Sequence, residues 1–284
     1  MFKIGVASLI WTEDFKKCDL PLIEKAKSLG FDVIDLNVAH PFQFPVQEVK
    51  AALKKVGIAP VTTIGLSKDG NLIDPDPEIR KNGVKMLKKL VDINIELGSP
   101  ITGGVNYAAW GYLTGRPRRQ EEWDWSVECM REIAGYARER SDLIICVEPV
   151  NRFETHLINI AEDAVKYCRD VGTGNVKVLL DTFHMVREEL SFSKAVQACG
   201  KEYLGYVHAC ENNRGIPGTG LVPWKKFLKA LQAIDYKGPL SIESFDPSFE
   251  ELNRLAAIWR KFADTGEELA IQGLKNLRKI ENSL

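Results

Sequence analysis

The sequence has no excess of charge of either sign and no dense set of cysteines. Its 284 residues carry 38 basic and 39 acidic side chains, which gives a formal net charge of −1. Nucleic acids and anionic membranes attract proteins with a basic face, so this balance gives no electrostatic reason to expect either partner. The six cysteines are scattered without a Cys-x-x-Cys pair. This spacing argues against a disulfide scaffold and favours reduced thiols in a cytoplasm.

Long apolar runs are also missing. No stretch approaches the roughly 20 apolar residues of a membrane-spanning helix. The first eleven residues place a lysine before a short apolar run, but Thr12, Glu13 and Asp14 follow at once. A first strand is therefore a better interpretation of this run than a signal peptide. There is also no low-complexity tract or linker, so we expect a cytoplasmic protein in which residues 1–284 form a single domain.

Eight short segments are apolar or β-branched on both faces and are bounded by turn signals, which is typical of buried parallel strands. These predicted strands are Lys3–Leu9, Val33–Val38, Ala59–Gly65, Ile101–Val105, Leu143–Val150, Val176–Thr182, Leu204–Cys210 and Leu240–Phe245. Helical patterns lie between and after them, over Leu20–Leu29, Pro45–Val56, Pro77–Leu97, Glu121–Arg138, Ala161–Val171, Phe192–Ala198, Pro223–Ile234, Pro247–Phe262 and Glu267–Ile280. This alternation predicts one (β/α)8 TIM barrel, with a doubly wound open sheet as the main competitor.

In such a barrel the chemistry takes place at the carboxyl ends of the strands, where the βα loops begin. Four consecutive predicted strands each bring one ionisable residue to that end, namely Glu148, Asp181, His208 and Glu243. Any one of them alone is better explained as a helix cap, a loop anchor or a hydrogen-bonded core residue. Four together are harder to explain in that way, because buried unpaired charges are costly. A divalent cation bound by all four removes that cost.

The types of donor indicate which metal to expect. Three carboxylates and one imidazole are mostly hard oxygen donors, so we expect Mn²⁺, with Co²⁺ or Mg²⁺ as alternatives. With four protein ligands, an octahedral ion keeps about two positions open, which a sugar carbonyl and its neighbouring hydroxyl would fill. Cys210 lies two residues after His208 and so faces the same side of the strand, and we interpret it as a packing residue.

Several long motifs resemble one known family. The segments EPVNRFETH (148–156), LDTFHM (180–185), HACENNRGIPGTGLVPW (208–224) and ESF (243–245) are similar, in this order, to those of the D-tagatose 3-epimerase and D-psicose 3-epimerase family. That family belongs to the xylose isomerase-like TIM barrels. The resemblance runs through the C-terminal half, and the N-terminal half agrees in barrel layout. Leu221 stands where many relatives have histidine, and Val186 where many have asparagine, so the preferred ketose stays open.

The resemblance implies metal-dependent C3 epimerisation of free ketoses, such as D-tagatose, D-fructose, D-psicose or ketopentoses, through a cis-enediolate. It implies that the metal ligands are Glu148, Asp181, His208 and Glu243. Glu148 and Glu243 would also exchange protons with the sugar as a base–acid pair. The implied contacts to substrate oxygens are Glu154, His184 in the loop after the sixth strand, and Arg214. Glu154 and His184 would also steady Glu148.

Three aromatic residues are further candidates for the substrate site. Trp11, Trp110 and Phe245 would form an apolar wall over the far end of the sugar, with core packing as an equal alternative for each. We also expect a homodimer or a homotetramer, although the sequence does not fix the number of subunits.

Other functions of the same metal barrel stay open. An aldose–ketose isomerase passes through the same kind of enediolate, and an inosose dehydratase-like enzyme would use a similar barrel for elimination. A sugar phosphate would need a clamp, for which the arginines of residues 115–119 are candidates, although a solvated helix start or a subunit contact is the favoured interpretation of this stretch. A DNA-repair endonuclease of this fold would need more than the four histidines present and a basic face. A barrel that only binds sugar would not need two opposed glutamates.

Overall fold

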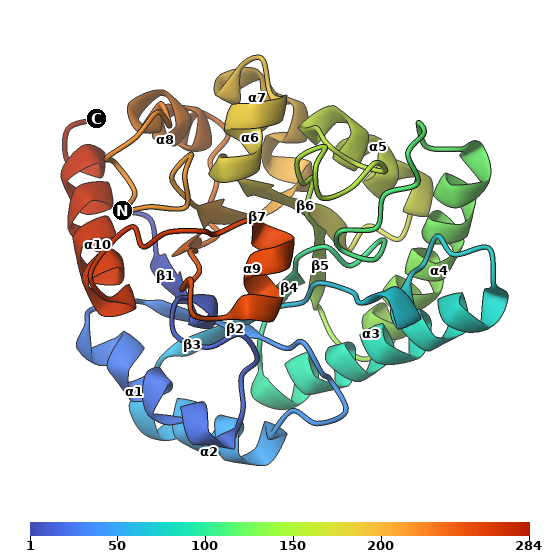
Figure 1. Ribbon diagram of the computed structural model, residues 1–284, viewed down its shortest axis with the longest axis horizontal. Coiled ribbons are helices and arrows are strands. Elements are labelled where there is room, and N and C mark those ends of the chain that lie inside the picture. Colours follow the sequence, from blue (N-terminus) through green and yellow to red (C-terminus); the bar gives the residue numbers. More distant parts are fainter.

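Eight parallel strands close into a barrel in the computed structural model, which describes residues 1–284. The strands follow one another around the barrel in chain order until β8 pairs with β1 (Figure 1). They are β1 Ile4–Ala7, β2 Val33–Asn37, β3 Ala59–Thr63, β4 Ile101–Gly103, β5 Ile144–Val147, β6 Val176–Asp181, β7 Leu204–Ala209 and β8 Leu240–Ile242. The predicted (β/α)8 barrel is confirmed, and the competing open sheet is wrong.

Helices surround the barrel as an outer ring (Figure 1). They are α1 Pro21–Ser28, α2 Val46–Val56, α3 Pro77–Leu97, α4 Gln120–Arg138, α5 Ala161–Val171, α7 Phe192–Tyr203, α8 Trp224–Ala233 and α10 Gly266–Glu281. Local sequence explains several of their ends. Prolines stand in the first turn of α1 and α3, while Gly57, Gly98 and Gly172 take the left-handed conformation that ends α2, α3 and α5. No helix is long and apolar enough to span a membrane.

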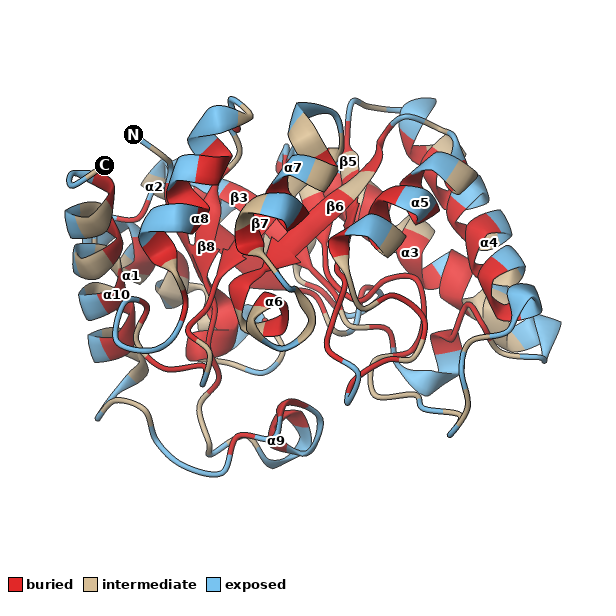
Figure 2. Cartoon of the chain, turned by 90° about the horizontal axis from the view of Figure 1, so that it is seen from above, coloured by how far each residue is buried: buried red, intermediate tan, exposed pale blue.

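Two short helices at the carboxyl end of the barrel differ from the prediction. Helix α6 (Thr182–Glu188) begins directly after β6, where the sequence suggested a loop, because Asp181 caps it by accepting a hydrogen bond from the backbone N–H of Phe183 at 2.8 Å. Helix α9 spans only Glu250–Ala256 instead of Pro247–Phe262, and it ends at Ala257, whose φ is 54°. Figure 2 shows α9 lying beyond the barrel on the same side as α6.

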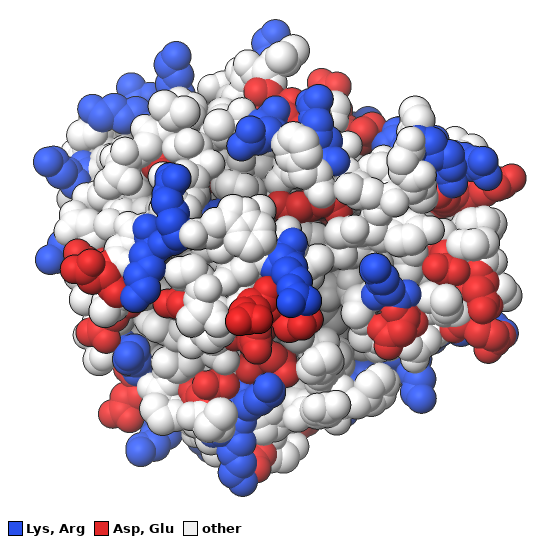
Figure 3. Space-filling model, in the orientation of Figure 1, with Lys and Arg blue, Asp and Glu red and all other residues white.

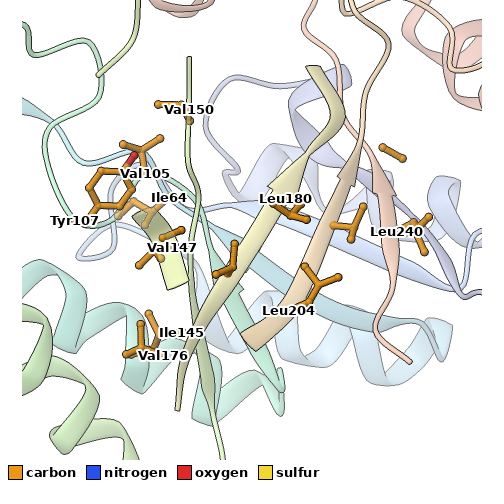
Figure 4. Close-up of a cluster of buried hydrophobic side chains, with 14 of the residues drawn as sticks. Ile64, Val105, Tyr107, Ile145, Val147, Val150, Val176, Leu180, Leu204 and Leu240 are labelled. Atoms are coloured by element: carbon orange, nitrogen blue, oxygen red, sulfur yellow. The ribbon is translucent and has the colours of Figure 1, made fainter. Parts of the chain in front are cut away.

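The strands are buried along almost their whole length, as the red strands of Figure 2 show. The main core is a cluster of 69 buried apolar residues. Figure 4 shows part of it, including Ile145, Val147, Val176, Leu180, Leu204 and Leu240 of four neighbouring strands. A smaller cluster, made of Val33, Val61, Cys146, Leu179 and Tyr206, occupies the alternate positions of the strands and so faces the barrel axis. The polar residues farther along the strands therefore stand on a rigid, close-packed base.

The carboxyl end of the barrel shows charged residues of both signs. Figure 3 looks onto this face, and its lysines, arginines, aspartates and glutamates are interspersed rather than gathered into a field of one sign. This face therefore lacks the basic patch that nucleic-acid binding needs.

The loop between β7 and α8 is held by one buried carboxylate, that of Glu211, which is 0% exposed. Its Oε2 accepts hydrogen bonds from the N–H of Gly218 at 2.9 Å and from the indole of Trp224 at 3.0 Å. Its Oε1 accepts from the N–H groups of Val222 and Asn212, both at 3.0 Å. One side chain thus ties both ends of the loop together.

We predict that Glu211→Gln destabilises the protein, because an amide NH₂ would replace one acceptor oxygen and face N–H donors. The expected loss of unfolding free energy is about 3 kcal/mol, seen as a lower urea midpoint by circular dichroism. The exposed Glu128→Gln on α4 is the matched control and should change stability by less than about 0.5 kcal/mol. Equal midpoints for the two variants would contradict this role of Glu211.

Candidate metal centre and active site

Four ionisable side chains meet at the carboxyl end of the barrel. Each offers one ligand atom, and these atoms lie within 4.8 Å of one another in the group Glu148, Asp181, His208 and Glu243, which is buried throughout. Strand alternation explains the meeting, because each residue lies two positions beyond an inward-facing residue of β5, β6, β7 or β8. The strand register also pairs Asp181 with His208. The structure therefore brings together the four residues that the sequence predicted as metal ligands.

The imidazole of His208 lies between two of the carboxylates. Its Nδ1 is buried and has no hydrogen-bond partner. This atom lies 3.4 Å from Oε2 of Glu243 and 3.8 Å from Oε1 of Glu148. A buried ring nitrogen without a partner is costly unless something binds it. Its position among carboxylate oxygens fits a divalent cation that prefers oxygen and imidazole ligands.

Burial and like charges work against ionisation of two of the three carboxylates. Burial raises the pKa of Glu148 well above its usual value, and the nearby Glu243 and Asp181 raise it further. Burial also raises the pKa of Asp181. For Glu243 burial acts in the same direction, but the positive charges of His208 and Arg214 outweigh it and hold the pKa below its usual value. Full ionisation of this cluster needs additional positive charge.

Arg214 supplies positive charge directly to the cluster. Its Nη1 donates to Oδ2 of Asp181 at 2.6 Å and to Oε2 of Glu243 at 2.8 Å. The guanidinium also lies over two rings, at 4.0 Å from the centroid of Phe183 and 4.9 Å from that of Phe245. Its backbone has a φ of 62°, which is uncommon for a residue other than glycine. The loop held by Glu211 thus delivers Arg214 over the carboxylates.

Cys210 borders the same cluster. Its Sγ lies 3.0 Å from Nη1 of Arg214 and 3.7 Å from Oε2 of Glu243. Cys210 is thus fully buried, and it also approaches the site, as its place in the strand allowed. Burial, together with the nearby Asp181, raises the pKa of this thiol, so it remains an S–H group rather than a thiolate.

His184 stands on α6 with one nitrogen directed at the cluster. Its Nδ1 accepts a hydrogen bond from the backbone N–H of Asn151 at 3.1 Å. Nε2 lies 3.6 Å from Oε1 of Glu148 and 3.7 Å from Oδ2 of Asp181. Burial, and then the charge of Arg214, lower the pKa of His184 well below its usual value. Nε2 also lies 3.2 Å from Nη2 of Arg214, so His184 is a neutral imidazole placed between Arg214 and the carboxylates.

Glu154 has different partners from those expected. Its Oε2 accepts from the indole of Trp110 at 2.6 Å, and its Oε1 accepts from the amide of Asn151 at 2.7 Å. These two bonds steady Trp110 and Asn151, and the structure shows no bond from Glu154 to Glu148. Burial raises the pKa of Glu154.

A cavity of about 410 Å³ opens above the cluster. Its lining includes Glu148, Glu154, His184, His208, Arg214 and Glu243, together with Trp110 and Phe245. Leu252 and Leu255 on α9 line its outer part. Trp11 does not line the cavity, because its ring packs beside Gly266 and Lys25 instead.

The arginines of residues 115–119 do not reach this cavity. Arg116 makes a two-pronged pair with Glu122, at 2.8 and 3.1 Å. Arg118 donates to the carbonyl of Leu157 at 2.7 Å and pairs with Asp163. These two side chains tie the βα loops together, and none of residues 115–119 lines the cavity, so the structure gives no support for a phosphate clamp there.

Two features of the site were not predicted from the sequence. Asp35 of β2 hydrogen-bonds to His208, and its signal was an acid inside the apolar run VIDLN, the same signal that marked the other strand ends. Asn151 holds both His184 and Glu154. Nothing in the local sequence shows this role, since a polar residue after a strand is common in any loop.

The comparisons with known proteins agree with this geometry. Residues 23–280 match the family described as xylose isomerase-like TIM barrel. The chain is 35% identical to the D-psicose 3-epimerase of Ruminiclostridium cellulolyticum over 274 residues, which cover 94% of this chain and 92% of that protein. It is 32% identical to the L-ribulose 3-epimerase of a Methylomonas species over 278 residues, covering 97% of this chain and 96% of that protein.

A solved structure is similar over nearly the whole chain. It is the D-allulose 3-epimerase from a Methylomonas species in complex with D-allulose, with a TM-score of 0.91 at 32% identity, covering 98% of this chain and 96% of that one. The named relatives are ketose 3-epimerases, which are enzymes of the isomerase class. With the closed barrel and the buried cluster at its carboxyl end, these matches show that the chain belongs to the xylose isomerase-like TIM barrel family and, within it, to the ketose 3-epimerases.

Proposed function

We propose that this protein catalyses the metal-dependent C3 epimerisation of free ketoses. One observation carries the proposal: Glu148 and Glu243, from β5 and β8, line one cavity and approach the same unpaired nitrogen of His208 from different strands. The relatives named for D-psicose and L-ribulose, and the neighbour that holds D-allulose, support a free ketose as the substrate.

The metal ligands in this proposal are Glu148, Asp181, His208 through Nδ1, and Glu243. The ion would be Mn²⁺, with Co²⁺ or Mg²⁺ as alternatives, since the donors are mostly oxygen. When bound, it supplies a Lewis acid that stabilises negative charge developing on the sugar oxygens at C2 and C3.

Inversion at C3 requires one group to remove the proton next to the C2 carbonyl and another to return a proton to the opposite face. Glu148 and Glu243 fit these two tasks. Without an ion, the cluster raises the pKa of Glu148 and lowers that of Glu243, so the two carboxyl groups differ in their tendency to hold a proton. Two carboxyl groups with separated pKa values are what an acid–base pair needs. Their roles exchange with the direction of the reaction.

Arg214, His184 and Glu154 would hold the sugar. Nη1 of Arg214 bonds to carboxylate oxygens of Asp181 and Glu243, two of the residues that would hold the ion. Arg214 would therefore compete with the ion for these carboxylates, and a guanidinium displaced from them would be free to donate to sugar hydroxyls. Nε2 of His184 faces the same region. Trp110 and Phe245 would form the apolar wall of the cavity.

We predict that chelation abolishes sugar interconversion and that Mn²⁺ or Co²⁺ restores it, because the four carboxylate and imidazole donors hold an exchangeable ion. The assay incubates the protein with D-fructose, D-psicose and D-tagatose before and after treatment with a chelator, with residual metal measured by elemental analysis. Full turnover by protein shown to be free of metal would exclude the proposed metal site.

We predict that Glu148→Gln and Glu243→Gln each lose at least about a hundredfold in rate, because each removes one proton carrier and weakens the metal site. Residual exchange of the C3 proton with deuterium should become one-sided, without inversion. Exposed Glu250 on α9 is the control, and Glu250→Gln should retain the wild-type rate.

The same labelling separates epimerisation from its rival. Wild-type protein should exchange and invert C3. Labelling at C1 with an aldose as main product would show an aldose–ketose isomerase instead. Exchange at neither carbon with any ketose tried would favour a dehydratase or a barrel that only binds sugar.

We predict that Arg214→Ala lowers kcat/KM by about a hundredfold while Mn²⁺ binding stays as tight or becomes tighter, since the competing guanidinium is gone. Titration calorimetry on chelator-treated protein measures the affinity, and steady-state kinetics measure turnover. Arg187→Ala, an exposed arginine on α6, should change neither quantity. Loss of Mn²⁺ binding in Arg214→Ala would mean that the arginine supports the fold of the site rather than the sugar.

A further inference from the structure

One buried acid near the site is not used by the reaction proposed above. Asp35 in β2 is 0% exposed and does not line the cavity. Its Oδ2 lies 3.1 Å from Nε2 of His208 and accepts a hydrogen bond from the hydroxyl of Tyr206 at 2.7 Å. Its Oδ1 accepts from the hydroxyl of Thr63 at 3.0 Å. Strands β2 and β7 are not neighbours, since β1 and β8 lie between them. The contact between Asp35 and His208 therefore crosses the inside of the barrel.

The contact decides which nitrogen of His208 carries hydrogen. Oδ2 of Asp35 is a carboxylate oxygen and accepts hydrogen bonds, so Nε2 of His208 presents an N–H to it. A metal-binding imidazole is neutral and has only one N–H, which leaves the lone pair on Nδ1. Nδ1 is the buried atom without a partner that faces Glu243 and Glu148. The hydrogen bond from Nε2 to Asp35 therefore leaves Nδ1 of His208 free to bind an ion.

The carboxylate of Asp35 is itself fixed in orientation. The Tyr206 hydroxyl lies 2.6 Å from Oγ of Ser241 as well as 2.7 Å from Asp35, and Thr63 binds the other carboxylate oxygen. All these groups are buried. Because each carboxylate oxygen has a fixed donor, Asp35 cannot rotate away from His208 without breaking other bonds.

We propose that Asp35 is a positioning residue that holds His208 as its Nε2–H tautomer with Nδ1 directed at the metal, and so sets the affinity of the site for a divalent ion. This inference rests on the proposed function only in requiring that an ion binds at the cluster. Asp35 touches neither the ion nor the sugar and acts through His208. Partners of this kind commonly contribute a factor of about 10 to 100 in metal affinity.

The first test compares Mn²⁺ affinity by titration calorimetry in chelator-treated wild type, Asp35→Asn and Tyr206→Phe. An asparagine can turn its NH₂ toward Nε2, which moves the ring proton to Nδ1 and blocks it, so Kd should rise by about 10- to 100-fold. Tyr206→Phe removes another bond to the same carboxylate but keeps the contact with His208, so its Kd should stay within about threefold of wild type. Equal losses in both variants would mean a structural role for the network and would overturn the proposal.

A double-mutant cycle separates action through His208 from a general effect. In a His208→Gln background, adding Asp35→Asn should change the Mn²⁺ Kd by less than about threefold, because no imidazole remains to be oriented. A further loss of 10-fold or more in that background would overturn the proposal. If wild-type protein itself binds no Mn²⁺, the proposed function fails; if it binds and Asp35→Asn binds equally well, only this inference fails.

A measurement on the wild-type chain does not depend on any variant at residue 35. In Mg²⁺-loaded protein with ¹⁵N-labelled histidines, the signals of His208 can be assigned by their loss in His208→Gln. The expected spectrum has hydrogen on Nε2 and none on Nδ1. A spectrum with hydrogen on Nδ1 would overturn the proposal even if Asp35→Asn failed to fold.

Discussion

The structure depends on how it keeps several carboxylates buried side by side at one end of a closed barrel. Glu148, Asp181 and Glu243 come from three strands and have little contact with water. Removing such charges from water costs several kcal/mol for each ion unless opposite charge is close. Arg214 provides that charge from within the chain, and a divalent ion would provide it when bound. The strands bring the carboxylates together, and the loop after β7 brings positive charge to them.

The strands of the barrel position the carboxylates, and the loop after β7 positions Arg214 over them. The ligand candidates stand at strand ends above close-packed apolar layers, so their geometry changes little with events at the surface. Arg214 stands instead on a loop that is tied at both ends by Glu211. A rigid charge cluster below and a cation on a loop above it suit the proposed exchange of protein contacts for substrate contacts.

The sequence was sufficient for the fold and for the buried cluster, because both leave strong local patterns. Buried parallel strands are apolar on both faces, and an acid at the end of one stands out, as Glu148 and Asp181 do. Contacts made only by folding were harder. Nothing in the local sequence decided whether Trp11 lines the cavity or packs elsewhere, and the spacing of Cys210 from His208 gave its side of the strand but not its contact with Glu243. The predicted helix Pro247–Phe262 is longer than α9, because the helical sequence pattern continues past Ala257, where the backbone becomes left-handed.

The contact between Asp35 and His208 could not be predicted from local sequence patterns. It also bears on the order in which the protein folds. The residues Asp35 and His208 are 173 positions apart, and they meet only because the ring of strands closes. Joining positions so distant has a large loop-closure cost, which makes such contacts late events in folding. A chain growing from its N-terminus lacks His208 until β7 has been synthesised. The complete set of ion ligands and their support thus comes together only at the end of assembly, and partly folded chains lack the finished site.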